Sequence, residues 1–378
     1  MSQSPLKVMP IVGTRPEAVK MAPLINLLRS RPDEFDVKVC ATAQHREMLD
    51  QVMNAFDVGY DYDLNIMQQG QTLTQVTTRA LQGLEDVLRE AKPDIVLAQG
   101  DTTTVLAASL AAAYAQIAFG HVEAGLRTDN KFDPFPEELN RRLTTQVTDL
   151  HFAPTDQSKR NLLREGVPES AIYLTGNTVI DALLQVTQGG KKVTAETGER
   201  MILVTTHRRE NLGAPLENIV GALSDILAKF EDTRIVYPMH KNPAVREIVR
   251  RELGDNPRVE LIEALDYLPF VKAMERAHLI LTDSGGVQEE APALGIPVLV
   301  LRRTTERPEG VTAGTANLIG TERADIVEAA SLLLGDEAAY AAMSHAANPY
   351  GDGKAGERIA QALLHWAGRG QRPDDFVV

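Results

Sequence analysis

The chain has 378 residues, which is more than one hydrophobic core usually organises, so we expect two domains. Its 39 basic and 52 acidic residues give a net charge of −13, which argues against nucleic acid or an anionic membrane surface as a general partner. The single cysteine, Cys40, cannot form an intrachain disulfide, and no apolar run approaches the roughly 20 residues that span a bilayer. Because the N-terminus also lacks a signal-peptide core, we expect a cytoplasmic protein with Cys40 packed in its interior.

Apolar, β-branched runs alternate with amphipathic segments, such as 73–91 and 216–230, along the whole chain. This alternation predicts two doubly wound, Rossmann-like α/β domains with parallel sheets. We expect an N-terminal domain at 1–176, a second domain at 177–354, and a helix and tail at 355–378. No sequence pattern decides where that helix packs, and we take the N-terminal domain as the expectation. The strands are expected at 8–12, 37–42, 95–99, 117–122, 150–153 and 172–175, then at 201–205, 235–239, 259–262, 279–282, 298–301 and 317–319.

The loop after the first strand has the pattern of an anion site. Gly13 permits a tight turn and Pro16 lies where a helix would begin, so free backbone N–H groups and the helix dipole would face one ligand. Arg15 and Lys20 add two cations, although a surface turn with solvated basic residues is the alternative. Ser284-Gly285-Gly286 repeats the pattern after a strand of the second domain. Two such loops, one in each domain, favour a diphosphate ligand.

Ligands of doubly wound sheets bind at the carboxyl ends of the strands, so polar residues there are candidates. Asp101, Glu123 and His207 each follow a predicted strand, and Glu137 begins a predicted helix. Asp101 has an alternative role as a helix cap, Glu137 as an acid favoured by the helix dipole, and His207 as a surface histidine. Glu123 is harder to explain in this way, because a parallel sheet would bury it. A buried carboxylate suits acid–base chemistry.

Several cofactor signatures are missing from the sequence. There is no Gly-x-x-x-x-Gly-Lys-Ser/Thr loop and no clustered Cys/His spacing for zinc. One Gly-x-Gly-x-x-Gly pattern runs from Gly351 to Gly356, but it follows a loop rather than a strand, so we do not interpret it as a dinucleotide site. We therefore expect no metal and no other cofactor.

Six sequence blocks, taken together, resemble one enzyme family. They are GTRPEAVK at 13–20, TAQHREMLD at 42–50, GDTTT at 100–104, HVEAGLR at 121–127, TDSGGVQEE at 282–290 and TERPE at 305–309. In this order they are similar to the non-hydrolysing UDP-N-acetylglucosamine 2-epimerases of bacteria, and the resemblance runs from Lys7 to about Arg358. It implies the glycosyltransferase-B fold, with two Rossmann-like domains around a central cleft. It also implies interconversion of UDP-GlcNAc and UDP-ManNAc for surface polysaccharides, and a homodimer.

The chemistry of this reaction narrows the mechanism. The C2 proton of an N-acetylhexosamine has no neighbouring carbonyl group, so inversion needs either oxidation with NAD or departure of UDP from C1. Without a credible NAD loop, elimination through a 2-acetamidoglucal is favoured. The resemblance implies that Asp101, Glu123 and Glu137 transfer protons, leaving open which one takes the C2 proton, and that His207 assists the departure of UDP. Substrate contacts are implied for Arg15, Lys20, Asp101, Glu123, His207, Leu265, Phe270, Ser284, Gly285, Gly286, Glu290 and Arg307.

Two positions depart from the family pattern: Leu265 stands where some members carry glutamine, and Gly70 where some carry arginine. Many bacterial members have a regulatory UDP-GlcNAc site, which the resemblance places at Gln44, His45, Gln71 and His240. Three alternative functions stay open from the sequence. They are a retaining UDP-sugar glycosyltransferase of the same fold, a hydrolysing epimerase that releases ManNAc and UDP, and a nucleotide-sugar-binding protein without catalysis.

Overall fold

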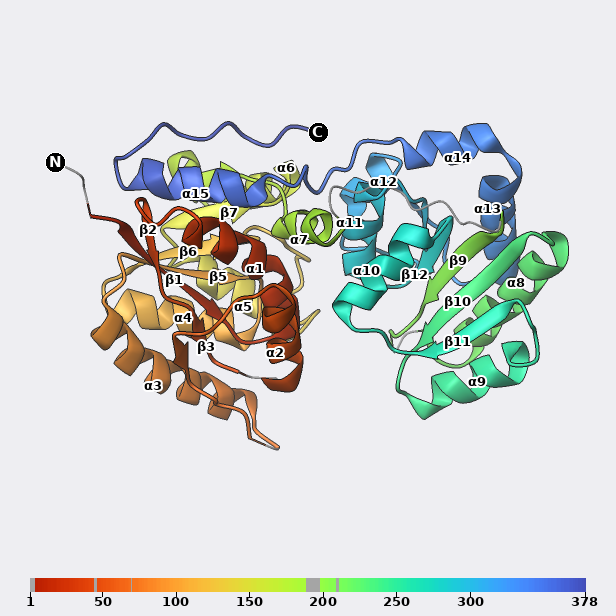
Figure 1. Cartoon of the computed structure of the whole chain (residues 1–378), viewed down its shortest axis with the longest axis horizontal. Helices are drawn as coiled ribbons and strands as arrows, with labels where there is room; N and C mark the ends of the chain where they lie inside the picture. The colour runs from red at the N-terminus through yellow and green to blue at the C-terminus, as the bar shows by residue number, and fades with distance from the viewer. Residues whose placement is uncertain (1–3, 44–45, 69, 188–197, 209–210) are drawn as a thin grey trace. The chain divides into compact units, whose positions relative to one another are not determined.

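The computed structural model of the chain describes residues 4–43, 46–68, 70–187, 198–208 and 211–378, with the side chains of 46–48 left aside (Figure 1). The described residues divide into two compact units. The first unit consists of Met1–Ala182 and Gly351–Val377, and the second unit of Leu183–Tyr350. The chain therefore enters the second unit within one helix and returns to the first unit just before its last helix.

The first unit is built on a parallel sheet of eight strands in the order β4-β3-β1-β5-β6-β7-β8, with β2 pairing beside β1. Figure 1 shows α3 and α15 on opposite sides of this sheet. The strands are β1 (Leu6–Val12), β2 (Phe35–Val37), β3 (Cys40–Ala41), β4 (Tyr62–Asp63), β5 (Ile95–Gln99), β6 (Ala118–Val122), β7 (Leu150–Ala153) and β8 (Ile172–Leu174). The helices are α1 (Arg15–Arg29), α2 (Arg46–Ala55), α3 (Leu73–Ala91), α4 (Thr103–Tyr114), α5 (Glu137–Thr145), α6 (Asp156–Arg164), α7 (Thr178–Val186) and α15 (Ala355–Trp366).

The second unit has a parallel sheet of six strands in the order β11-β10-β9-β12-β13-β14. This is the 3-2-1-4-5-6 order of a Rossmann domain, and it confirms the predicted doubly wound class. The strands are β9 (Arg200–Thr205), β10 (Thr233–Met239), β11 (Val259–Glu263), β12 (Leu279–Thr282), β13 (Val298–Val300) and β14 (Ala316–Leu318). The helices are α8 (Ala214–Lys229), α9 (Pro243–Leu253), α10 (Tyr267–Arg276), α11 (Gly285–Ala293), α12 (Pro308–Thr312), α13 (Arg323–Gly335) and α14 (Glu337–Ser344).

The predicted strands lie within two residues of the observed bounds, with one exception. The predicted strand 37–42 is wrong as a single element, because it consists of the ends of β2 and β3, which both pair with β1. Between them the N–H of Val39 donates to the Asp61 carboxylate at 2.9 Å instead of to a neighbouring strand. The two-residue strand β4 was not predicted, since two residues are too few to show a period.

The apolar pattern of the sequence explains how the helices pack. One stripe of the long helix α3 is buried, and its residues recur at three- and four-residue spacing: Val76, Ala80, Leu84, Val87 and Leu88. The helix packs on α4, and both cover strands β1 and β5 from one side. Cys40 is buried in this core, as expected.

The C-terminal helix α15 packs against α1 in the first unit. The buried carboxylate of Asp181 caps it, accepting the N–H of Ala355 at 3.2 Å and of Gly356 at 2.8 Å. Burial raises the pKa of Asp181 to about 6. The Gly-x-Gly-x-x-Gly pattern thus ends at a helix start whose N–H groups already have a partner in the chain, so it offers no dinucleotide site.

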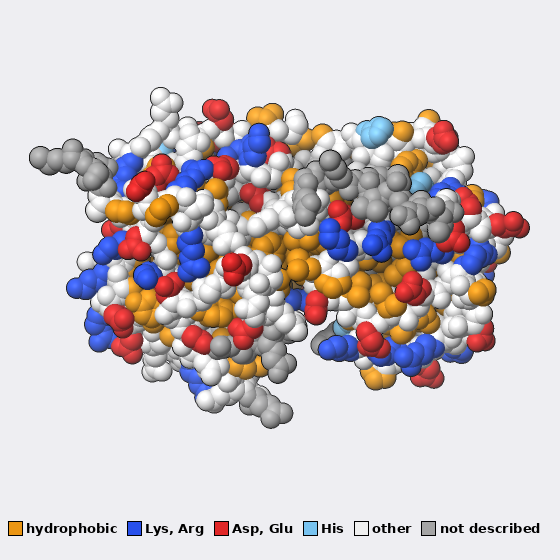
Figure 2. All heavy atoms as spheres, viewed as in Figure 1, with side chains coloured by type: hydrophobic (Ala, Val, Ile, Leu, Met, Phe, Trp, Pro, Cys, Tyr) orange, Lys and Arg blue, Asp and Glu red, His pale blue; other side chains and the backbone are white. Residues whose placement is uncertain are grey.

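Basic side chains gather on the second unit where α9 lies, as Figure 2 shows. They have acidic partners: Arg246 Nη1 contacts Glu263 Oε1 at 2.8 Å, and Arg251 Nε contacts Glu252 Oε1 at 2.7 Å. These ion pairs offset part of the positive charge of this surface. Among the described residues, the structure contains no helix long and apolar enough to cross a membrane.

Candidate active site

The strand order of the first unit reverses between β1 and β5, and the loops that follow these two strands are joined by Glu17 of α1. Its Oε2 accepts the N–H of Gly13 at 2.6 Å and of Thr14 at 3.2 Å, and its Oε1 accepts the Thr102 hydroxyl at 2.6 Å. The side chain lies in the interior, where Glu17 is 2% exposed. Burial raises the pKa of this carboxyl to about 7, in spite of the hydrogen bonds that it accepts.

This arrangement corrects one expectation. The N–H groups after Gly13 were expected to be free for a phosphate, but Glu17 already occupies them. Sequence reasoning missed Glu17, although Thr14-x-x-Glu17 has the spacing of a capping box, a signal that could have found it. Arg15 is half-buried, and its guanidinium has no ion pair with any described residue. It is therefore the cation of this loop that stays available for a ligand.

Glu123 follows β6 in a backbone conformation that few residues other than glycine adopt. Its φ is +65°, in the left-handed region, where a longer side chain is strained. The carboxylate is buried as expected, accepts a hydrogen bond from Gln99 Nε2 at 2.5 Å and forms an ion pair with Lys20. Lys20, which we expected beside a diphosphate, thus reaches from α1 to the end of β6. Strain together with this contact set marks Glu123 as a functional candidate.

Asp101 follows β5 and is tied to α5. Its Oδ2 lies 2.5 Å from Arg141 Nη2, and its carbonyl oxygen accepts Asn140 Nδ2 at 2.8 Å. Arg141 also contacts the fully buried Glu138 at 3.2 Å. Glu137, half-exposed at the first position of α5, stands four residues before Arg141 and so on the same face of this helix. The structure therefore connects the elements that carry the predicted acids Asp101 and Glu137, through two α5 residues that were not predicted.

His121 supports the same loop from inside the sheet. Its Nε2 lies 2.7 Å from the carbonyl oxygen of Gly100, so Nε2 carries the hydrogen and donates it. Burial lowers the pKa of His121 to about 4, which keeps the ring neutral at pH 7. The His121 ring therefore anchors Gly100 beside Asp101.

In the second unit the strand order reverses between β9 and β12, and Asp283 joins the loops that follow them. Its Oδ2 accepts the N–H of His207 and of Arg208, both at 3.0 Å, and Nδ2 of Asn211 at 2.9 Å. Its Oδ1 lies 2.9 Å from Nδ1 of His207. Asp283 is fully buried, whereas the His207 side chain is 46% exposed. Burial acts to raise the pKa of Asp283, but the hydrogen bonds from His207 and Arg208 lower it below its ordinary value.

Helix α11 begins in the same place, directly after Asp283. Ser284 is its N-cap residue, and the half-buried Gly285 and the exposed Gly286 begin its first turn. The Ser284 side chain makes no cap hydrogen bond to a described residue. Nearby, Glu306 accepts Arg208 Nη2 at 2.7 Å. Although burial opposes it, bonding to Arg302 and Arg208 lowers the pKa of Glu306 to about 2.

Four predicted residues of the second unit remain, and one of them, Glu290, has its carboxylate oxygen Oε2 only 3.7 Å from where a Cβ on Gly286 would lie. Arg307 is held by an ion pair with the buried Glu289. Leu265 is half-buried between β11 and α10, Phe270 of α10 packs on the core of the second unit, and Glu290 is buried in α11.

Of the regulatory candidates, Gln71 lies in the first unit, where its amide donates to the carbonyl oxygen of Ile66 at 2.8 Å. His240 is exposed in the second unit and accepts the Asn242 N–H at 3.2 Å. Gln44 and His45 lie outside the described residues.

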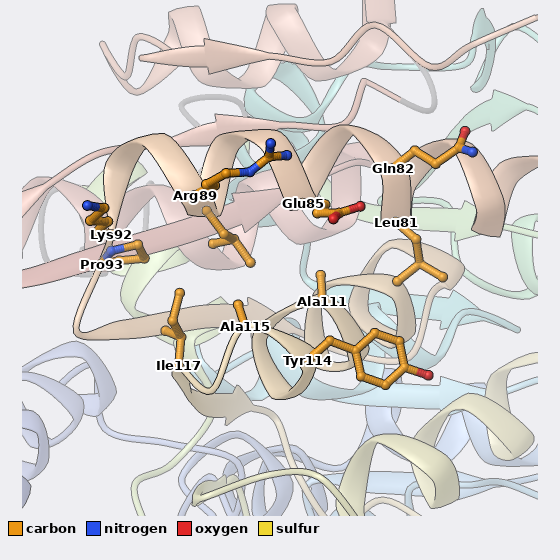
Figure 3. A pocket seen from close by; sticks show the side chains of 11 residues that line it. Leu81, Gln82, Glu85, Arg89, Lys92, Pro93, Ala111, Tyr114, Ala115 and Ile117 are labelled. Atoms are coloured by element: carbon orange, nitrogen blue, oxygen red, sulfur yellow. The ribbon is translucent and has the colours of Figure 1, made fainter.

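A pocket of about 710 Å³ opens between α3 and α4 of the first unit (Figure 3). Its lining includes Leu81, Tyr114, Pro93 and Ile117. Pro93 and Ile117 come just before β5 and β6, so the pocket lies toward the amino ends of these strands. Because the candidate acids follow the carboxyl ends of the same strands, this pocket is not part of the candidate site.

Comparison with known proteins decides the family. A family model described as UDP-N-acetylglucosamine 2-epimerase matches residues 28–364. The chain belongs to this family. The UDP-N-acetylglucosamine 2-epimerase of Bacillus subtilis (strain 168) is 56% identical over 376 residues, which cover 98% of this chain and 99% of that protein. The epimerase of Escherichia coli (strain K12) is 56% identical over 370 residues, covering 95% of this chain and 98% of that protein.

A solved structure of UDP-GlcNAc 2-epimerase from Neisseria meningitidis, bound to UDP-GlcNAc, has a TM-score of 0.85 and 48% identity. The matched region covers 95% of the present chain and 100% of the chain in the Neisseria meningitidis structure. The matches extend over both units, so the family resemblance predicted from the six sequence blocks is confirmed.

Proposed function

We propose that this protein is an isomerase that interconverts UDP-GlcNAc and UDP-ManNAc by inverting the sugar at C2. Family membership over nearly the whole chain supports the substrate. The observation that carries the chemistry is Glu123, a buried carboxylate on a strained backbone at a strand end, held by Lys20 and Gln99. Strained backbone conformations cluster at functional sites, so the strain at Glu123 supports a functional role for this carboxylate.

The proposed reaction is an elimination followed by re-addition. A carboxylate takes the C2 proton, the C2–H electron pair forms a C1=C2 double bond, and the C1–O bond breaks with its electrons passing to UDP. The products of this half are UDP and 2-acetamidoglucal. Protonation of C2 from the opposite face and return of the UDP oxygen to C1 then give the epimer. The elimination and re-addition together cause no net oxidation or reduction of the sugar, so the reaction needs no electron acceptor.

We assign the proton transfers to Asp101, Glu123 and Glu137, without choosing which one takes the C2 proton. Two groups are needed, because the proton leaves one face of the sugar and arrives on the other. The contacts of Asp101 with α5 support this assignment, since Arg141 and Asn140 hold it beside the helix that begins at Glu137.

We assign UDP to the second unit. The first turn of α11, to which the Ser284 side chain makes no cap hydrogen bond among the described residues, supports diphosphate binding there, because its N–H groups and helix dipole attract anions. In this assignment His207 assists the departure of UDP and Glu290 holds the ribose hydroxyls. The remaining proposed substrate contacts are Arg15, Lys20, Leu265, Phe270, Ser284, Gly285, Gly286 and Arg307. We also propose a regulatory UDP-GlcNAc site that includes Gln71 and His240, and this proposal rests on the family resemblance alone.

The proposal is tested by incubating the pure protein with UDP-GlcNAc in D₂O, without nicotinamide. We expect both epimers at equilibrium, with deuterium at C2, measured by ¹H NMR. Retention of the C2 proton during epimerisation would refute the elimination. Release of free ManNAc and UDP would indicate a hydrolysing epimerase, and an unchanged or slowly hydrolysed donor a glycosyltransferase.

The proposal also includes a homodimer located in the cytoplasm, as the family resemblance implies. Light scattering coupled to size-exclusion chromatography would test the dimer, and a mass near the 41.3 kDa of one chain would contradict it.

A further inference from the structure

The two carboxylate oxygens of Asp283 have different tasks. Oδ2 accepts three N–H donors, two from the backbone of His207 and Arg208 and one from Asn211, and these contacts lie at 2.9–3.0 Å. Oδ1 faces Nδ1 of His207 at 2.9 Å, with the His207 N–H farther away at 3.2 Å. One oxygen therefore fastens the loop after β9, and the other is left for the imidazole ring.

This division determines how the ring of His207 is protonated. Oδ1 belongs to a buried carboxylate with a lowered pKa, so it is an acceptor, and Nδ1 must carry a hydrogen to reach it. The opposite nitrogen, Nε2, has no hydrogen bond to a described residue, and the side chain is 46% exposed. In the neutral ring Nε2 is therefore an open acceptor, and in the charged ring it is an outward donor.

We propose that Asp283 is a positioning residue of the epimerase reaction, which orients His207 so that its Nε2 exchanges a proton with the UDP leaving group. The inference rests on the proposed function above. When the C1–O bond breaks, the proton on Nε2 passes to the departing diphosphate oxygen, and the ring is left neutral with its hydrogen on Nδ1. On re-addition the same proton returns to Nε2. The buried carboxylate stabilises the charged ring during each cycle, as the buried aspartate does in Ser-His-Asp triads.

The alternative is that Asp283 only closes the loop after β9 through its backbone contacts. Asp283→Asn separates the two roles. The three N–H donors around Oδ2 require an acceptor, so the amide oxygen of the variant must turn toward them. Its NH₂ group then faces Nδ1 of His207, which has to accept instead of donate. The ring keeps a hydrogen bond and the loop keeps its cap, but the ring hydrogen moves to Nε2.

The first measurement is ¹⁵N NMR of histidine-labelled full-length protein without substrate, at a pH where the ring is neutral. In the wild type we expect the His207 signal of the form protonated at Nδ1, and in Asp283→Asn the form protonated at Nε2. Asn211→Ala is the matched control, because it removes a donor from Oδ2 and leaves Oδ1 with His207. We expect this control to keep the wild-type form. A wild-type ring protonated at Nε2, or the same form in wild type and Asp283→Asn, would overturn the proposal.

The second measurement is kinetic. A ring with its hydrogen on Nε2 still donates to the bound diphosphate but cannot give up and retake a proton. We therefore expect Asp283→Asn to lower kcat about 100-fold, at the low end of general acid–base effects, with KM changed less than about threefold. In a His207→Gln background the same substitution should cost less than about twofold, because its effect passes through the ring. An undiminished cost in that background would show a structural role.

The two proposals can fail separately. If the wild type does not epimerise UDP-GlcNAc, the proposed function fails, whereas the NMR comparison still tests the pairing of Asp283 with His207. If the wild type is active but the ring form does not depend on Asp283, only the positioning role fails.

Discussion

Glu17 allows a quantitative test of the structure, because its burial should make the stability of the protein depend on pH. The carboxyl is 2% exposed, and burial raises its pKa from the ordinary 4.5 to about 7. A group whose pKa is higher in the folded state stabilises the fold fully below its unfolded pKa, and the contribution is lost as the pH rises through the folded pKa. At about 1.4 kcal/mol for each pH unit, the loss between pH 4.5 and pH 7 is about 3 kcal/mol.

Glu17→Gln removes this dependence and keeps the shape of the side chain. The amide oxygen can accept the Gly13 N–H, and the amide nitrogen can donate to the Thr102 hydroxyl. Relative to the variant, the wild type should therefore lose about 3 kcal/mol of unfolding free energy between pH 5 and pH 9. Urea unfolding of both proteins at pH 5, 7 and 9 measures this difference. The second unit is the same in both proteins, so its contribution cancels.

Glu165→Gln provides a control of opposite sign. Hydrogen bonds from Arg127, at 2.6 and 2.7 Å, hold the pKa of Glu165 below its ordinary value. Its contribution is present above the unfolded pKa and is lost as the pH falls. The control should therefore be less stable than the wild type at pH 7, by an amount that shrinks in acid. If the difference between wild type and Glu17→Gln is the same at pH 5 and pH 9, the reasoning about Glu17 is refuted.

Two further substitutions test the candidate site. Glu123→Gln should lower kcat about 1000-fold while UDP affinity, measured by calorimetry, stays within about threefold; loss of UDP binding as well would indicate a structural role. Gly13→Ala should lower the unfolding free energy by about 2 kcal/mol or more, because the new Cβ would lie 2.2 Å from Thr104 Oγ1 and 2.4 Å from Thr42 Oγ1. Its control is Gly59→Ala, where nothing lies within 4 Å of the new atom, and equal losses in thermal unfolding would contradict the packing argument.

The sequence predicts most strands well because they contain runs of buried apolar residues, such as Ile95–Gln99 and Leu279–Thr282. Two strand predictions failed because the backbone groups involved have partners that are distant in the sequence. The predicted strand 37–42 is interrupted because Val39 bonds to the Asp61 carboxylate, 22 residues away, and nothing in the local pattern contains this contact. The strand β4 is defined by its pairing with β3, in which Tyr62 lies beside Cys40.

For the site, the strand-end rule selects residues that do follow strands, but it does not predict the contacts of their side chains. Asp101 and Glu123 follow strands as predicted, and the structure shows that these strands, β5 and β6, are parallel neighbours. The ion pair of Asp101 with Arg141, 40 residues away, depends on where α5 docks, and periodicity carries no such information. Asp283 likewise pairs with His207, which lies 76 residues earlier in the chain. This contact depends on β9 and β12 being neighbours in the sheet.

The loop after Gly13 shows a conflict between two local rules that use the same atoms. A glycine turn before a helix exposes N–H groups that attract an anion, and a glutamate at the third helical position satisfies the same groups from within the chain. Here Glu17 stands at that position, so a phosphate at α1 would have to displace a carboxylate that the fold already holds at 2.6 Å. Helix α11 has no acidic residue in its first turn, and the side chain of its N-cap residue, Ser284, makes no cap hydrogen bond to a described residue. The two loops therefore differ in what their backbone offers an anion, although both have a glycine turn before a helix.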